Sequence, residues 1–171
     1  VVVCHELCYG VMYEKLYELM HSGVIGELIA IDAMERVAYW HMAQAYVRLQ
    51  AGTGNTTYPT ILAKCSHDMD LVQYYAGAQC DTVTSIGGET LFRKENAPKD
   101  AAERCLDCPH VDTCTYSAKK IYIEGFRKRG CPKFVWPFNK VSLKKPTTEA
   151  DLYEGIRTTY FGKCVFRCGV E

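Results

Sequence analysis

The order of apolar segments most constrains the fold of this chain, because strand-like and helix-like runs alternate along it. Residues 1–4 are an unbroken apolar run with the length of a buried strand, and residues 11–21 repeat apolar side chains at helical spacing. A second strand-like stretch, rich in Ile, Ala and Met, covers residues 28–37. This strand, helix and strand order predicts a domain that combines helices with a β-sheet.

Further segments continue the alternation. Residues 61–75 predict a helix, and the β-branched run over residues 82–86 predicts a strand. Residues 160–167 predict a last strand. Between these, Thr148 and Asp151 have the spacing of a capping box, which predicts the start of a short helix.

Length and charge narrow the class of protein. A chain of 171 residues can bury one core, so we expect one domain over residues 1–171, with a cysteine-rich insertion at about 100–140. Twenty basic residues balance twenty acidic ones, so no global charge favours binding to nucleic acid or to an anionic membrane. No apolar run approaches the roughly 20 residues of a membrane span, and the first residues lack signal-peptide features. A cytoplasmic location is therefore expected.

Three ionisable side chains share one face of the helix predicted over residues 61–75. Successive helical residues turn by about 100°, which places Lys64, His67 and Asp68 together. A histidine in such a cluster can exchange a proton with a substrate hydroxyl, as an alcohol dehydrogenation requires beside a hydride-accepting cofactor. The same spacing is also typical of an ordinary solvated helix face. The neighbouring stripe predicted to face the core is Ile61, Cys65, Met69 and Val72.

An aromatic and polar run follows the second strand-like stretch. Tyr39, Trp40 and His41 are consecutive, and sugars are commonly held by an aromatic face with polar neighbours. The run is therefore a candidate substrate contact. Tyr39 and Trp40 are also ordinary core residues, which leaves the structural interpretation open.

The order of several motifs resembles that of one oxidoreductase family. The matching segments are His5-Glu6-Leu7-Cys8-Tyr9, then Ser22 to Glu27 at the end of a helix, then Tyr39-Trp40-His41, and finally Ile61 to Leu71. In this order they resemble the glucose-fructose oxidoreductase, inositol dehydrogenase and MocA (Gfo/Idh/MocA) family. The resemblance covers nearly the whole chain.

The resemblance implies a fold, a cofactor and partners. Members of the family pair an N-terminal Rossmann domain with a C-terminal α+β domain, whose open, mainly antiparallel β-sheet carries helices on one face and forms a dimer surface. The chain is similar only to the second domain, because it has no G-x-G-x-x-G turn and no Glu-Lys-Pro motif. NAD(P) and the missing Rossmann domain are therefore expected partners outside this fragment, which should be inactive alone. A homo-oligomer through the open sheet is also expected.

The resemblance also implies site residues. In the family's His-x-x-Asp helix signature the histidine maps onto His67, as the proton-handling residue, and the aspartate onto Asp70. The aspartate that the family usually has four positions before the histidine is replaced here by Ala63, and Lys64 is the candidate to fill the role of that aspartate. The arginine usual in the first motif is replaced by Cys8. The substrate contacts implied are His5, Tyr9, Tyr39, Trp40, His41, Asp68 and Asp70.

The cysteines of the insertion form a candidate metal site. Cys105, Cys108 and Cys114 have the spacing C-x₂-C-x₅-C, which allows three thiolates to converge on one ion. Tetrahedral zinc needs a fourth ligand, for which Cys164 is the first candidate and Cys131, Cys168 and His110 are alternatives. Reduced structural thiols, a disulfide or an iron–sulfur site are the other interpretations. A zinc ion held by four thiolates would stabilise the fold and would take no part in catalysis.

Two functions remain open. The first is the substrate-binding half of an NAD(P)-dependent dehydrogenase acting on a sugar, polyol or related small hydroxy compound. The second is a cysteine-clipped, zinc-stapled structural or dimerisation module without catalysis. The first predicts binding of a small-molecule substrate and the second does not.

Overall fold

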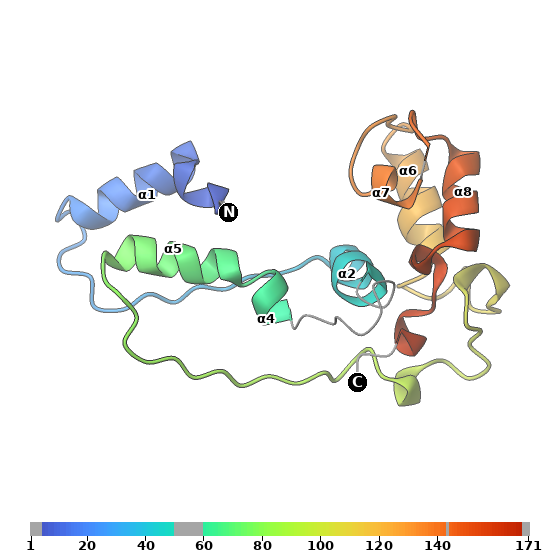
Figure 1. Cartoon of the computed structure of the whole chain (residues 1–171), viewed down its shortest axis with the longest axis horizontal. Helices are drawn as coiled ribbons and strands as arrows, with labels where there is room; N and C mark the ends of the chain where they lie inside the picture. Colours follow the sequence, from blue (N-terminus) through green and yellow to red (C-terminus); the bar gives the residue numbers. More distant parts are fainter. Residues whose placement is uncertain (1–4, 50–59, 143, 169–171) are drawn as a thin grey trace, which may run out of the picture. The chain divides into compact units, whose positions relative to one another are not determined.

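The computed structural model describes residues 5–49, 60–142 and 144–168. These residues form two compact units, each made of two stretches of sequence. The described part of the first unit consists of residues 5–36 and 60–87, and that of the second of residues 37–49, 88–142 and 144–168. Helices and helical turns form the regular structure of both units (Figure 1).

The first unit pairs two helices of similar length. Helix α1 (Val11–His21) is the helix that the apolar spacing predicted, and it follows the 3₁₀ turn η1 (Glu6–Tyr9). Helix α5 (Ser66–Ala76) follows the short α4 (Thr60–Ala63), and Gly77 ends it in a left-handed conformation with φ 61°. The ring of Tyr17 stacks on that of Tyr74 with centroids 4.6 Å apart, so aromatic contacts join α1 to α5.

The second unit contains the buried core. Its aromatic side chains meet edge to face, as do Phe126 and Phe138 at 5.3 Å and Tyr122 and Phe161 at 5.9 Å. The elements of this unit are α2 (Tyr39–His41), the π-helical turn η2 (Met42–Arg48), η3 (Lys94–Asn96), η4 (Cys105–Asp107), the π-helical turn η5 (Lys119–Glu124), α6 (Gly125–Lys128), α7 (Phe138–Val141), α8 (Glu149–Thr158), η6 (Tyr160–Gly162) and η7 (Val165–Arg167). All of them except η3 contribute side chains to the core or pack against it.

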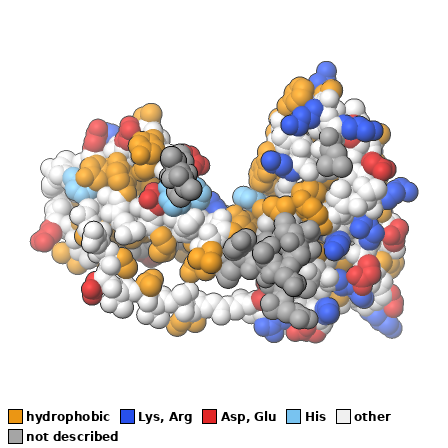
Figure 2. Space-filling model, in the orientation of Figure 1, with side chains coloured by type: hydrophobic (Ala, Val, Ile, Leu, Met, Phe, Trp, Pro, Cys, Tyr) orange, Lys and Arg blue, Asp and Glu red, His pale blue; other side chains and the backbone are white. Residues whose placement is uncertain are grey.

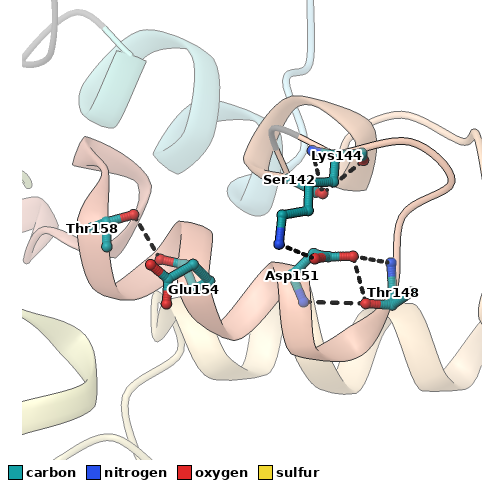
Figure 3. A network of polar contacts seen from close by, with 6 residues as sticks. All are labelled: Ser142, Lys144, Thr148, Asp151, Glu154 and Thr158. Carbon is teal, nitrogen blue, oxygen red and sulfur yellow. Dashed lines mark hydrogen bonds and ion pairs between the residues drawn. The ribbon is translucent and has the colours of Figure 1, made fainter.

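Helix α8 begins with the predicted capping box, which is confirmed. The backbone N–H of Asp151 donates to the Thr148 hydroxyl, and the backbone N–H of Thr148 donates back to the Asp151 carboxylate at 3.1 Å (Figure 3). Lys144 approaches the same carboxylate at 3.6 Å. Carbonyl groups at the C-terminal end of α8 also have hydrogen-bond partners, because the Arg104 guanidinium donates to the carbonyls of Ile156 and Thr159, both at 2.6 Å.

The predicted open β-sheet is wrong, because the described residues contain no β-strand. Residues 28–37 and 82–86 run without regular structure and have no backbone ladder of hydrogen bonds (Figure 1). Residues 160–167 form the turns η6 and η7, with one isolated antiparallel bridge between Arg104 and Lys163. The predicted strand over residues 1–4 lies outside the described residues.

The predicted helix over residues 61–75 is interrupted. Lys64 and Cys65 form a turn between α4 and α5, and the backbone N–H of His67 bonds to the carbonyl of Lys64 at 3.3 Å. The stripe predicted to face a core does not do so, since Ile61 is 45% exposed and Met69 is 48% exposed. Figure 2 shows apolar side chains on the surface of this unit.

Candidate functional site

Two histidines from distant parts of the sequence meet in the first unit. His5 precedes η1 and His67 lies in the first turn of α5, and their rings are 5.1 Å apart in an edge-on arrangement. The Nδ1 atom of His5 is 3.6 Å from the Oδ1 atom of Asp70, which lies one turn beyond His67 on α5. The site thus combines two imidazoles and a carboxylate, which can together hold and move a proton.

The polar atoms of this cluster are not all satisfied. His67 and Asp68 are half-buried, and the Nδ1 of His67 and the Oδ2 of Asp68 are buried with no hydrogen-bond partner among the described residues. Unpaired buried polar atoms cost free energy, and they are found where a ligand or water completes the site. These two atoms, like the hydroxyl oxygen of Tyr75 in the same unit, are therefore places at which a polar ligand or water would gain a hydrogen bond.

The turn before α5 adds a second set of polar contacts. The Nζ of Lys64 is 3.4 Å from the Oε1 of Glu35, a residue that sequence reasoning did not select. Burial, followed by the charge of Asp68 beside it, raises the pKa of the Cys65 thiol. Nothing in the sequence marks Glu35 as a site residue. It lies in a segment expected to be a strand, and only the tertiary structure brings it to Lys64.

The remaining residues predicted in the first motif lie at the edge of this cluster. Tyr9 is 76% exposed at the end of η1. The thiol of Cys8 donates to the carbonyl of His5 at 3.4 Å, so the residue in the usual arginine position contacts the backbone of a site residue. The first motif and α5 therefore meet through His5 and Asp70.

The other predicted substrate contacts belong to the second unit. Trp40 lies 5.0 Å from Trp136 and His41 lies 4.8 Å from the same ring, measured between centroids. The guanidinium of Arg129 lies 5.6 Å from the Trp40 ring centre, a cation–π contact. Trp40 and His41 therefore form an aromatic cluster with Trp136, and the ring of Tyr39 contacts that of Tyr116 at 6.2 Å. All three residues belong to a different unit from His67.

A cavity of about 220 Å³ opens beside this aromatic cluster. Tyr39 and Trp40 line it together with three cations, Lys120, Lys128 and Arg129, none of which the sequence analysis selected. Lys120 and Lys128 are eight residues apart, close to two helical turns, and this spacing is the signal that could have identified them. Aromatic faces and cations suit a hydroxylated ligand that carries negative charge.

The predicted metal ligands line one small cavity in the second unit. Its volume is about 20 Å³, and Cys105, Cys108, Cys114, Cys164 and His110 are among the residues around it. The alternative ligands are placed differently: Cys168 is buried nearby, whereas Cys131 is exposed in a left-handed turn with φ 54°. Within the described part of the chain, no three His, Cys, Asp or Glu side chains are arranged to coordinate a metal, and every described cysteine is free.

A buried arginine, missed by sequence reasoning, also lines this cavity. Arg48 is 0% exposed and donates to the carbonyls of Lys163 and Tyr116 and to the Cys105 sulfur. Burial raises the pKa of Cys164 and raises that of Cys168 to about 11. The only sequence signal for Arg48 is its position between Val47 and Leu49, a cation flanked by apolar residues.

Comparison with known proteins adds no identification. The chain matches no protein-family model, no curated protein and no solved structure. Within the described residues, no helix combines the length and the apolar character needed to cross a bilayer. Any functional conclusion must therefore come from the side chains themselves.

Proposed function

We propose that this chain is the substrate-side part of an NAD(P)-dependent oxidoreductase of the Gfo/Idh/MocA type, acting on a small hydroxy compound. The observation that carries the proposal is the meeting of His5, His67 and Asp70. Two motifs about 60 residues apart in the sequence supply this cluster, and the resemblance names residues of both. If His67 were an ordinary surface histidine, its clustering with His5 and Asp70 would not be expected.

The chemistry proposed for the cluster is removal of a hydroxyl proton. His67 accepts the proton as the C–H hydride leaves, and the carboxylate of Asp70, which pairs with the neighbouring His5, supplies negative charge near the imidazolium that forms. NAD(P) supplies the hydride acceptor when it is bound. The sequence has no G-x-G-x-x-G turn, so these residues do not fit the nucleotide, and a Rossmann domain outside them must hold it.

The aromatic and cationic cavity suggests which hydroxy compounds to try. Lys128 and Arg129 beside Trp40 favour a sugar acid or another anionic polyol over a neutral one. This cavity belongs to the second unit, so it is tested separately from His67. Binding of matched pairs, each a polyol and its carboxylated form, is measured by calorimetry with wild type and Lys128→Ala.

The decisive experiment is a turnover assay on the complete gene product with NAD and NADP, over a panel of polyols, sugars and sugar acids. His67→Asn is expected to reduce kcat by about 100-fold or more, the usual contribution of a general base. His21→Asn is the matched control, since His21 lies in the same unit but is exposed on α1 and bonds to the Tyr17 carbonyl. Wild-type turnover in His67→Asn would remove the proposed role, and absence of any nucleotide-dependent oxidation would remove the class.

A further inference from the structure

The second unit contains a cluster of thiols that the proposed oxidation does not use. Two 3₁₀ turns are each flanked by cysteines: Cys105 opens η4 and Cys108 follows it, and Cys164 and Cys168 flank η7 in the same way. The bridge between Arg104 and Lys163 holds the two turns together, and the backbone N–H of Cys164 donates to the Glu103 carbonyl at 2.9 Å. Segments almost 60 residues apart therefore bring their thiols to one place.

A third segment completes the set. The backbone N–H of Cys114 donates to the carbonyl of His110 at 2.8 Å, which turns the chain so that Cys114 reaches the same cavity as Cys105, Cys108 and Cys164. The ring of His110 is already engaged, because its Nε2 is 2.7 Å from the Lys99 carbonyl. That contact leaves the Nδ1 atom of His110 able to bind a metal, but the four thiols that line the cavity already supply a complete tetrahedral ligand set.

The size of the cavity limits what it can hold. A volume of about 20 Å³ exceeds the roughly 10–15 Å³ that a single water needs and is far below that of a multi-iron cluster. It therefore has room for one water molecule or one small ion and excludes a cluster. Four thiol ligands around a single ion are the donor set of tetrahedral structural zinc, with Zn–S distances of about 2.3 Å.

The buried arginine is an independent sign that the cavity holds negative charge. Arg48 is fully buried, and its Nη1 atom has no hydrogen-bond partner among the described residues. If the thiols are neutral, this cation has no counter-charge among the described residues, which is costly inside a protein. Zinc with four thiolates carries a net charge of −2, so a loaded site supplies the missing counter-charge, and Arg48 already donates to the Cys105 sulfur at 3.4 Å.

We propose that Cys105, Cys108, Cys114 and Cys164 bind a single Zn²⁺ ion, which staples three segments of the second unit around Arg48. The thiols rotate toward the cavity when the ion binds, because their present arrangement is not a coordinating one. Cys168 is the nearest further thiol and Cys131 is outside the set. The inference is independent of the proposed oxidoreductase activity, since a closed four-thiolate site has no open position for a substrate.

Metal analysis of the whole chain tests the proposal first. Protein purified under reducing conditions without chelators is expected to carry stoichiometric zinc, and the protein stripped of metal is expected to take up Co²⁺ with the absorption bands of a tetrahedral thiolate site. Both readouts use wild type, so they do not depend on the folding of a variant. Absence of both, with all thiols titrating equally with and without Zn²⁺, overturns the proposal.

Substitutions then identify the ligands. Cys108→Ser and Cys114→Ser are each expected to weaken zinc affinity on the order of 100-fold, as measured against a chromophoric competitor. Cys131→Ser and Cys80→Ser are the matched controls, because both cysteines are exposed and outside the cavity, and they are expected to bind zinc as wild type does. Equal losses in controls and ligand variants overturn the assignment.

Discussion

The two units differ in how much of their apolar surface is buried. In the second unit Leu152, Tyr122 and Ile123 are all 0% exposed, whereas Tyr75 is the only buried residue among the described residues of the first unit. The first unit leaves Ile29 85% and Ile86 96% exposed. Within the described residues, the core therefore lies in the unit with the thiol cavity, and the unit with the candidate proton-transfer residues buries only Tyr75.

Because of this difference, we expect one unit to provide most of the stability and the other to carry the proposed chemistry. Burial of apolar surface is the main source of folding free energy, so the second unit should dominate the stability of the chain. The extended residues 28–37 and 82–86 in the first unit have apolar side chains and no partner strand within the described residues. Variants matched between the two units can break or sharpen this comparison.

The largest effect is expected from glycines that differ in their surroundings. A Cβ atom at Gly162 would overlap the carbonyl group of Ile156 and crowd the Nη2 of Arg104, whereas a Cβ at Gly87 would meet nothing within 4 Å. Gly162→Ala should cost about 4 kcal/mol or more, because backbone atoms cannot move aside cheaply, and Gly87→Ala should stay within about 0.5 kcal/mol. Urea denaturation followed by circular dichroism measures both. Similar midpoints for the two variants would contradict the close packing of η6 on α8.

A leucine pair tests the core directly. Leu152 on α8 is 0% exposed and Leu62 on α4 is 64% exposed. Leu152→Ala should lower the free energy of unfolding by about 2–5 kcal/mol, and Leu62→Ala by about 0.5 kcal/mol or less. Thermal and urea unfolding give the values. If Leu62→Ala proved as costly as Leu152→Ala, Leu62 would be buried in the folded chain, and the contrast between the units would fail.

The sequence predicted those elements whose signals are local. The helix over residues 11–21 and the capping box at Thr148 and Asp151 follow from spacing and hydrogen bonds within a few residues, and both are confirmed. The sheet was wrong because a strand also needs a partner, and an apolar run such as residues 82–86 does not specify one. Partner choice is a property of the tertiary structure.

The candidate sites also contain some residues that sequence patterns identify and others that only the tertiary structure identifies. Motif spacing selected Cys105, Cys108 and Cys114, whereas Cys164, which lines the same cavity, was one of several candidates for the fourth ligand and had no diagnostic spacing. The family resemblance selected His5, His67 and Asp70. Neither could select Arg48, because its burial depends on packing between η2 and segments more than 50 residues away. The helix stripe led to a wrong core assignment because periodicity identifies an apolar face without showing what covers it.

A smaller effect is expected at the start of α8. Thr148→Ala removes the hydroxyl that accepts the Asp151 N–H, and the loss of such a cap costs about 1 kcal/mol. Thr158→Ala is the control on the same helix, since its exposed hydroxyl only donates to the Glu154 carbonyl (Figure 3). Urea midpoints should fall for Thr148→Ala and change little for Thr158→Ala. Equal changes would mean that the capping box adds nothing to the second unit.

The smallest expected effect is on the free energy of unfolding at acidic pH. Hydrogen bonds from Thr148 lower the pKa of Asp151 in the folded chain, and Lys144 acts in the same direction. The folded state therefore binds this proton only at a lower pH than the unfolded state does. The stabilisation is fully present above the ordinary value of 3.8 and is lost as the pH falls through the folded pKa.

Asp151→Asn isolates this contribution, because an amide does not titrate. Its urea midpoint should be lower than that of wild type at neutral pH, and the difference should shrink as the pH falls below the ordinary carboxyl value. Glu154→Gln, one turn further along α8, is the control and should follow the wild-type pH dependence. A difference between Asp151→Asn and wild type that stays constant with pH would show that the carboxylate charge does not stabilise α8, which would leave the hydrogen bonds of Thr148 as the whole of the cap.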